Sequence, residues 1–175
     1  LVFNKDGKIS YAVISFGGFL GMGEKFFAIP WESLSAGTDL TLILDVDRSR
    51  LQKAPGFDKY NWPKIADSAW STEVDKWYYP NGKAPDRSWG GKAHSLNSAV
   101  VKNSAGTKIG NVEDIIVDLD NGRATLVIVH TLPTFEPKDV LVAIPWNSLS
   151  VMPHDNVFSL NSANVDLARA QVFSK

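Results

Sequence analysis

The sequence predicts a mainly β protein of the all-β class, in which two small β-barrels stand in tandem. The octapeptide "FAIPWESL" at 27–34 returns as "VAIPWNSL" at 142–149, with six of the eight positions identical. A repeat of this kind indicates two copies of one domain. Runs of β-branched residues between turn signals dominate both copies, and little of the chain has helical periodicity, which favours small barrels.

The repeat extends well beyond the octapeptide. A shift of 115 positions places Val2 on Val117 and Gly7 on Gly122 without a gap. With one residue inserted after the octapeptide, three apolar positions near the end of each copy also align: Leu51, Ala54 and Phe57 with Leu167, Ala170 and Phe173. Their spacing of three predicts one closing helical turn in each copy.

Each copy reads as a hairpin followed by short strands. "VFNKDGKISYAVIS" at 2–15 and "NVEDIIVDLDNGRATLVIVH" at 111–130 are β-branched runs around a turn rich in Asp, Asn and Gly. "KFFAIPW" and "VLVAIPW" read as strands that end at proline, which lacks the N–H that a ladder needs. "DLTLILDV" and "NVFSL" supply the next short strand.

These patterns place the first barrel at 1–57, a connector at 58–95 and the second barrel at 96–175. Leu1 aligns with Ile116, so the first copy lacks the opening strands that the second copy has. An incomplete barrel exposes unpaired backbone groups along an edge. We therefore expect residues before Leu1, or strands from another chain, to complete the first barrel.

The connector is rich in aromatic residues and contains four of the six tryptophans. Trp70, Val74 and Trp77 lie on one face of a short predicted helix, with Asp67 or Ser68 as its N-cap. One interpretation is that this helix covers exposed faces of the barrels, whose cores are small. The other is that the aromatic rings bind sugars or proline-rich peptides. Under the second interpretation the connector tryptophans Trp62 and Trp89 are candidate docking residues.

Composition argues against several classes of partner. The 18 Lys and Arg balance 19 Asp and Glu, so the chain has no overall field that would hold nucleic acid. No apolar run approaches the roughly 20 residues that span a bilayer, so no membrane span is expected. The absence of cysteine excludes disulfides and thiolate metal sites but is compatible with either the cytoplasm or the periplasm.

Three motifs that suggest chemistry fail on spacing. In "GGFLGMGEK" at 17–25, Glu24 and Lys25 stand where a phosphate loop needs Lys and Ser or Thr. "DLDNG" at 118–122 lacks the alternation of a calcium loop and reads as a hairpin turn. The three histidines show no metal-ligand spacing: His94, His130 and His154. We expect no cofactor, no metal and no catalytic residue, while Phe19 and Leu20 at the tip of the glycine loop remain candidate docking residues.

The sequence resembles the PRC-barrel family in "GTKIGNVEDIIVDLDNGRATLVIV", in both "AIPW" strands and in "SFGGFLGMGEKFFAIPWESL". It is similar to bacterial tandem members, to the cytoplasmic domain of the photosynthetic reaction centre H subunit and to the C-terminal domain of the ribosome-maturation factor. The resemblance implies a PRC-type barrel in each half and docking onto other proteins rather than catalysis. It also makes the repeated residues the expected barrel core: Ile29, Pro30, Trp31, Ile144, Pro145 and Trp146.

We therefore expect a non-catalytic module for protein docking or assembly, with a protein partner or a second copy, as in a homodimer, as the occupant. The alternative is a domain that binds a small ligand or a peptide through the aromatic connector. The two differ in what they require: a ligand site needs a concave pocket with a few convergent polar groups, whereas a docking module needs a flat apolar patch or an open strand edge.

Overall fold

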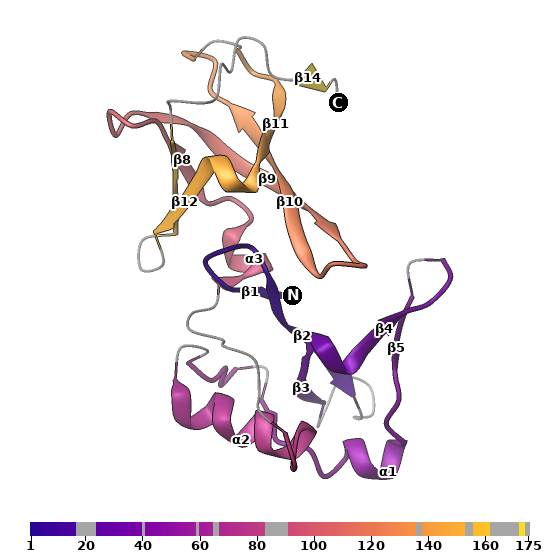
Figure 1. The fold of residues 1–175 in the computed structure, drawn as a ribbon. Coiled ribbons are helices and arrows are strands. Elements are labelled where there is room, and N and C mark those ends of the chain that lie inside the picture. The colour runs from indigo at the N-terminus through magenta and orange to yellow at the C-terminus, as the bar shows by residue number, and fades with distance from the viewer. Residues whose placement is uncertain are drawn as a thin grey trace. The chain divides into compact units, whose positions relative to one another are not determined.

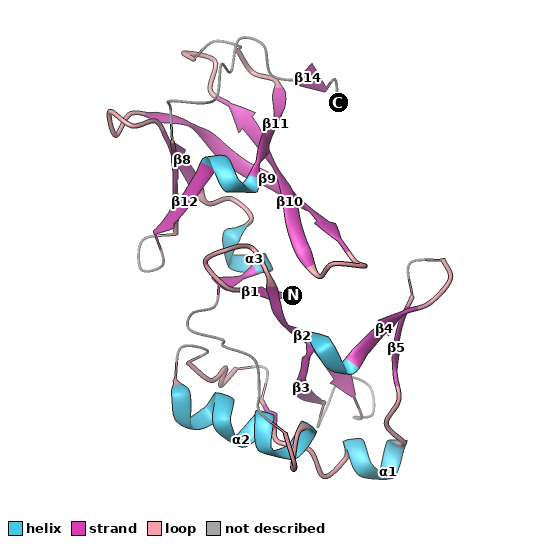
Figure 2. Cartoon of the chain, in the orientation of Figure 1, coloured by secondary structure: helices cyan, strands magenta, loops and turns pink. Residues whose placement is uncertain are grey.

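The computed structural model describes residues 1–16, 24–39, 41–58, 60–64, 67–82, 91–135, 138–152, 156–161 and 172–173. The chain divides into two compact units, and each is considered by itself. Unit 1 comprises Leu1–Asn4 and Ile9–Gly90, and unit 2 comprises Lys5–Lys8 and Gly91–Lys175. Strands predominate over helices in the described chain, which confirms the predicted all-β class (Figure 1, Figure 2).

Unit 1 is built on antiparallel strands in the order β6-β3-β2-β1. These strands are β1 (Val2–Phe3), β2 (Ile9–Phe16), β3 (Lys25–Pro30) and β6 (Gly56–Phe57). A separate hairpin pairs β4 (Leu34–Ala36) with β5 (Leu42–Leu44).

Unit 2 contains a seven-stranded sheet in the order β12-β13-β8-β9-β10-β11-β14. Its strands are β8 (Val100–Lys102), β9 (Lys108–Asp118), β10 (Arg123–Thr131), β11 (Leu141–Pro145), β12 (Leu149–Met152), β13 (Val157–Leu160) and β14 (Val172–Phe173). All neighbours are antiparallel except β13 and β8, which are parallel. The short elements β7 (Gly91–Lys92) and α3 (Ala93–Leu96) precede this sheet in the chain.

The turn and proline signals of the sequence are realised in the structure. The predicted Asp-Asn-Gly turn joins β9 to β10, and Gly122 there has a positive φ of 60°. β3 and β11 both end at a proline, and a single 3-10 turn follows each of them: η1 (Trp31–Ser33) and η2 (Trp146–Ser148). A proline at the last strand position ends the ladder because it has no N–H to donate.

Two helices of unit 1 begin at aspartate caps. The carboxylate of Asp47 accepts a hydrogen bond from the backbone N–H of Arg50 at 2.8 Å, which caps α1 (Arg48–Leu51). Asp67 caps α2 (Ser68–Tyr78) in the same way, by accepting from the N–H of Ala69 at 2.9 Å. The sequence allowed either Asp67 or Ser68 as the α2 cap, and the structure selects Asp67.

The closing helical turn predicted from Leu51, Ala54 and Phe57 is only partly correct. Leu51 ends α1, and both Leu51 and Ala54 are buried. Phe57, however, lies in β6, opposite Phe26 of β3. The ladder with β3 satisfies backbone groups of this segment, so a strand replaces the last part of the predicted turn.

The β2–β3 ladder of unit 1 and the β10–β11 ladder of unit 2 have the same cross-strand register, displaced by 115 positions. In unit 1 the pairs on one face are Tyr11 with Pro30, Val13 with Ala28, and Ser15 with Phe26. In unit 2 they are Leu126 with Pro145, Ile128 with Ala143, and His130 with Leu141. Since partners directly opposite one another project from the same side of a sheet, the aligned residues occupy equivalent positions. We call this side the outer face.

The alternate residues of these same strands project from the opposite side of the sheet, which we call the inner face. In unit 1, Phe27 and Ile29 pack there against Leu51 and Ala54 in one buried cluster. In unit 2, the equivalent strand residues are all fully buried: Val127, Val129, Val142 and Ile144. The repeated tryptophans Trp31 and Trp146 are also buried. The inner faces are therefore core in both units.

Candidate functional site

The outer face of unit 1 is covered by α2. Val74 is fully buried and forms a cluster with Val2, Tyr11 and Ala28. Trp70 and Tyr78 of the same helix pack against this cluster, so the contact residues follow the i, i+4, i+8 spacing of one helix face.

The expectation that this helix packs inward onto a barrel is confirmed for Trp70 and Val74. The ring of Trp70 lies 5.5 Å from that of Tyr11, at an interplanar angle of 56°. Trp77 instead packs against the inner-face cluster of unit 1, and Tyr78 packs against both clusters. Tyr78 was missed by the sequence reading, although it lies one helical turn beyond Val74.

The outer face of unit 2 is partly open to solvent. Its strand residues Leu126, Ile128, Leu141 and Ala143 are half-buried. Ile116 of β9, opposite Leu126, has an exposed fraction of 43%. We define these five residues together with Pro145 as the open face of unit 2.

Burial at equivalent positions shows the difference directly. Ala28 is 1% exposed in unit 1, whereas Ala143, the same residue type at the same register position, is half-buried. Tyr11 is fully buried, whereas Leu126 is half-buried. Among the described residues of unit 2 the helices are α3 and η2, and neither is as long as α2 (Figure 2).

Pro145 departs from the expected barrel core. The other five repeated core residues are buried, Pro30 among them. Pro145 is exposed because it lies on the outer face, opposite Leu126, where unit 2 has no described counterpart of α2. The repeated sequence thus forms the same strand in both copies, but a described helix packs over that strand's outer face in unit 1 alone.

Trp62 lies in an aromatic cluster beside α2. Its ring is 4.8 Å from that of Phe57 and 6.0 Å from that of Phe26, with interplanar angles of 59° and 42°. Phe57 in turn meets Trp70 edge-on at 6.3 Å. The rings are half-buried and tilted against one another, which is the geometry of aromatic packing. The other candidate docking residues, Phe19, Leu20 and Trp89, lie outside the described residues.

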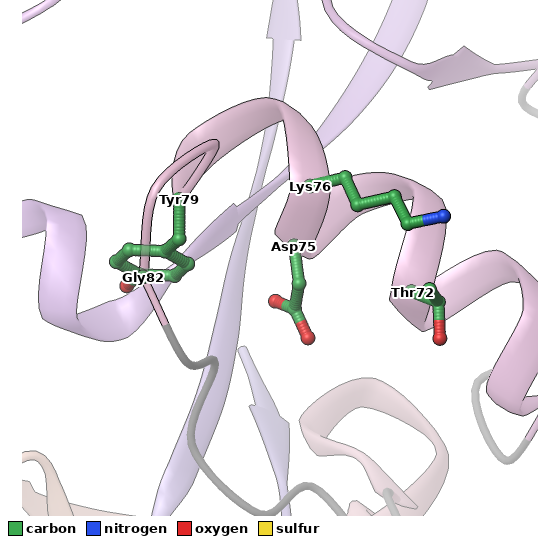
Figure 3. A pocket seen from close by; sticks show the side chains of 5 residues that line it. All are labelled: Thr72, Asp75, Lys76, Tyr79 and Gly82. Carbon is green, nitrogen blue, oxygen red and sulfur yellow. The ribbon is translucent and has the colours of Figure 1, made fainter.

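A small pocket opens beside the C-terminal half of α2. It has a volume of about 160 Å³ and is lined by Thr72, Asp75, Lys76, Tyr79 and Gly82. Figure 3 shows the Asp75 carboxylate and the Lys76 ammonium pointing in different directions from the helix. The pocket is smaller than the roughly 300 to 1,000 Å³ typical of ligand sites.

A second pocket, in unit 2, has a volume of about 340 Å³. Its walls come from the β8–β9 turn and from β12 and β13: Lys102, Asn103, Ser104, Gly106, Met152, Val157 and Ser159. Among the described residues that line this pocket, Lys102 is the only one with a titratable side chain.

Titratable groups with shifted pKa values have structural causes. A hydrogen bond from the Ser49 hydroxyl lowers the pKa of Asp47, which is the α1 cap. The Asn121 side-chain amide likewise lowers the pKa of Asp118 in the β9–β10 turn. Burial raises the pKa of Tyr78 well above its ordinary value, with the positive charge of Arg50 opposing the shift.

The described histidines lie in different elements of unit 2. His130 Nε2 lies 3.0 Å from a carboxylate oxygen of Asp139 at the exposed end of β10. His94 lies in α3, and His154 lies outside the described residues. Within the described ranges, no group of three or more His, Asp or Glu residues is arranged to hold a metal ion.

These features define a mainly β protein in which the β2–β3 and β10–β11 ladders share one register. The chain belongs to the PRC-barrel family: the family model for the PRC-barrel domain matches residues 1–51 and 92–164. No curated protein sequence matches the chain. In the part of the chain that the structure describes, no helix has the length and apolar character needed to cross a membrane.

Proposed function

We propose that this protein is a non-catalytic tandem PRC-barrel module that docks onto a protein partner through the open face of unit 2. The observation that carries the proposal is the difference between Ala28 and Ala143, which occupy equivalent positions but differ in burial. PRC-barrel domains are generally non-catalytic and often mediate protein interactions, which is compatible with this role.

The open face has the composition that protein interfaces use at their centre. Ile116, Leu126, Ile128 and Leu141 are aliphatic. Ile116 lies opposite Leu126, whereas Leu141 lies opposite His130, diagonal to Ile128. Burial of apolar area gives roughly 25 cal/mol per Å², so covering several such side chains favours association. Polar residues flank them, including Asp114 opposite Ile128, which matches the usual arrangement of an apolar centre and a polar rim.

The test compares partner capture by three forms of the full chain. The first is the wild type, the second is Ile128→Asp on the open face, and the third is Ile43→Asp. Ile43 is a matched control because it is an exposed isoleucine of β5, in unit 1. The proposal predicts a protein that co-purifies with the wild type and Ile43→Asp but not with Ile128→Asp, and that binds again after both components are purified.

Light scattering on the same three forms tests self-association. A dimer that Ile128→Asp alone dissociates would identify a second copy as the partner. Equal recovery of every captured protein with Ile128→Asp, together with an unchanged mass, would remove the open face as the docking surface.

The alternative function, binding of a small ligand or peptide by the connector, has one supporting observation. Phe26, Phe57 and Trp62 form a half-buried aromatic cluster that reaches the surface. Titration of the full chain with oligosaccharides and with a proline-rich peptide, followed by tryptophan fluorescence, tests it. A saturable change that Trp62→Ala abolishes would favour this function over docking.

A further inference from the structure

We infer that the occupant of the open face is an amphipathic α-helix of another protein, carrying apolar residues at i, i+4 and i+8. The inference rests on the proposed docking function and names the kind of partner. Its template is within the chain, since α2 already occupies the equivalent face of unit 1 with Trp70, Val74 and Tyr78.

The length of that helix face fits the sheet. A helix rises 1.5 Å per residue, so positions i to i+8 span about 12 Å. Neighbouring strands lie about 4.8 Å apart, so this length reaches across three adjacent strands. β9, β10 and β11 are adjacent in unit 2 and carry the whole open face.

The centre of the face is the same in both units. Ala28 contacts the cluster of Val74 in unit 1, and its small side chain allows the helix to approach the sheet closely. Ala143 keeps this small residue in unit 2, opposite Ile128. A medium-sized aliphatic residue at position i+4 of the partner helix therefore fits over Ala143.

The ends of the face differ in a way that specifies the occupant. Leu126 stands where unit 1 has Tyr11, and Leu141 stands where it has Phe26. Both replacements remove aromatic volume from the sheet side. The partner helix must supply that volume, which favours aromatic residues at i and i+8, as in α2, whose Trp70 meets Tyr11.

The rim adds a charge preference. Asp114 is exposed and lies opposite Ile128 on β9. A Lys or Arg beside the apolar stripe of the partner would face this carboxylate, which raises the association rate and makes binding weaken with salt. α2 itself carries Glu73 and Asp75 beside its apolar stripe, and Lys76 is the one basic residue of Ser68–Tyr78.

The experiment uses the α2 sequence as the probe. A peptide of residues 67–79, held helical by a hydrocarbon staple between the exposed positions 72 and 76, is titrated into the full chain labelled at Ala, Ile and Leu methyl groups. A second peptide also carries Glu73→Lys and Asp75→Lys, and a third carries Val74→Asp. A staple is needed because an isolated helix of this length is marginal in water.

We expect the native-sequence peptide and the lysine peptide, which both keep Val74, to shift the methyl signals of Leu126, Ile128, Leu141 and Ala143. The lysine peptide should bind more tightly than the native sequence, with the difference reduced at high salt, and the Val74→Asp peptide should not bind. Ile128→Asp in the chain should weaken binding about tenfold or more, which corresponds to about 1.4 kcal/mol, whereas Ile43→Asp should leave it unchanged.

A second variant of the open face separates loss of peptide binding from loss of folding. Ile116 is substantially exposed, so Ile116→Asp should keep the fold. It should also weaken binding of the peptide. Absence of shifts on the open face, or wild-type affinity for the peptide in both Ile128→Asp and Ile116→Asp, overturns the helix proposal. If the peptide does not bind while partner capture still depends on Ile128, the docking function stands and only the proposal of a helical partner is wrong. If capture is independent of Ile128 as well, both proposals fail.

Discussion

Ile128 of β10 lies directly opposite Ala143 of β11, and 115 positions earlier Val13 and Ala28 form the same pair between β2 and β3. In unit 1 the pair packs under α2. In unit 2 both residues are half-buried on a face with no described helix of comparable length. One strand pattern therefore occurs in two environments, and the difference supports the proposed docking role.

Trp146→Ala should destabilise unit 2 severely. Trp146 is buried and meets Phe158 edge-on at 5.6 Å, so truncation leaves a large cavity and removes an aromatic pair. Such a change typically costs about 3 to 5 kcal/mol. Urea unfolding followed by circular dichroism measures the loss. Trp62→Ala serves as the control, since its half-buried ring should cost less; an unchanged stability for Trp146→Ala would show that this tryptophan is not core.

Gly7→Ala should cost more than Gly106→Ala, although both glycines have a similar positive φ. The φ angles are 76° and 79°, so alanine meets the same backbone strain of about 1 to 2 kcal/mol at either position. A Cβ at Gly7, which belongs to unit 2, would lie 2.7 Å from the Trp146 indole nitrogen, whereas a Cβ at Gly106 meets nothing within 4 Å. Overpacking adds about 1 to 3 kcal/mol.

Thermal melts of the two glycine variants provide the comparison. We expect the Gly7→Ala midpoint to fall further than that of Gly106→Ala. Equal midpoints would mean that the turn Lys5–Lys8 does not pack on Trp146.

Tyr78→Phe should leave unit 1 as stable as the wild type or more stable at neutral pH. The Tyr78 hydroxyl is buried with no hydrogen-bond partner among the described groups, and an unsatisfied buried hydroxyl is costly. Denaturant midpoints at pH 7 measure the effect. A clear loss of stability would show that the hydroxyl makes a stabilising contact.

The same tyrosine predicts a dependence on alkaline pH. Burial raises the pKa of Tyr78 above its ordinary value of about 10, with Arg50 opposing. Its contribution to stability is therefore full below pH 10 and is lost as the pH rises toward the folded-state pKa, because the unfolded chain ionises first. The wild type should therefore lose more stability than Tyr78→Phe as the pH rises from about 10 to about 11. Parallel pH profiles of the two proteins would contradict this.

Val74→Asp should release α2 from unit 1 and expose a second apolar face. Val74 is fully buried against Tyr11 and Ala28, so a carboxylate there loses its hydration without a partner. We expect red-shifted tryptophan emission and increased binding of an apolar dye. Glu73→Gln, at the exposed neighbouring position, is the control and should show neither change. A Val74→Asp protein with wild-type emission would contradict the packing of α2.

Much of the fold follows from sequence because its signals are local. The β9–β10 turn, the strands that end at Pro30 and Pro145, and the inward face of α2 at Val74 are all set by neighbouring residues. Phe57 was placed in a helical turn because a spacing of three does not separate a turn from a short strand. The β6 ladder that resolves this ambiguity joins residues far apart in the chain.

The covering of the two faces was not predictable from the repeat. Self-similarity aligns Pro30 with Pro145 and Ala28 with Ala143, but it carries no information about which segment packs above them. The uneven burial of these pairs depends on α2, which lies outside the repeated segments. Phe19, Leu20 and Trp89 lie outside the described residues, so their docking role stays a prediction.

The most direct measurement compares Ala28 and Ala143, the same residue type at the same register position, in one sample. Methyl-labelled alanine is observed by NMR while a soluble gadolinium chelate is added, which broadens signals according to their solvent exposure. We predict strong broadening of the Ala143 methyl signal and protection of the Ala28 methyl signal. Equal protection of both methyl groups would show that the face of unit 2 is already covered and would contradict its role as an open docking surface.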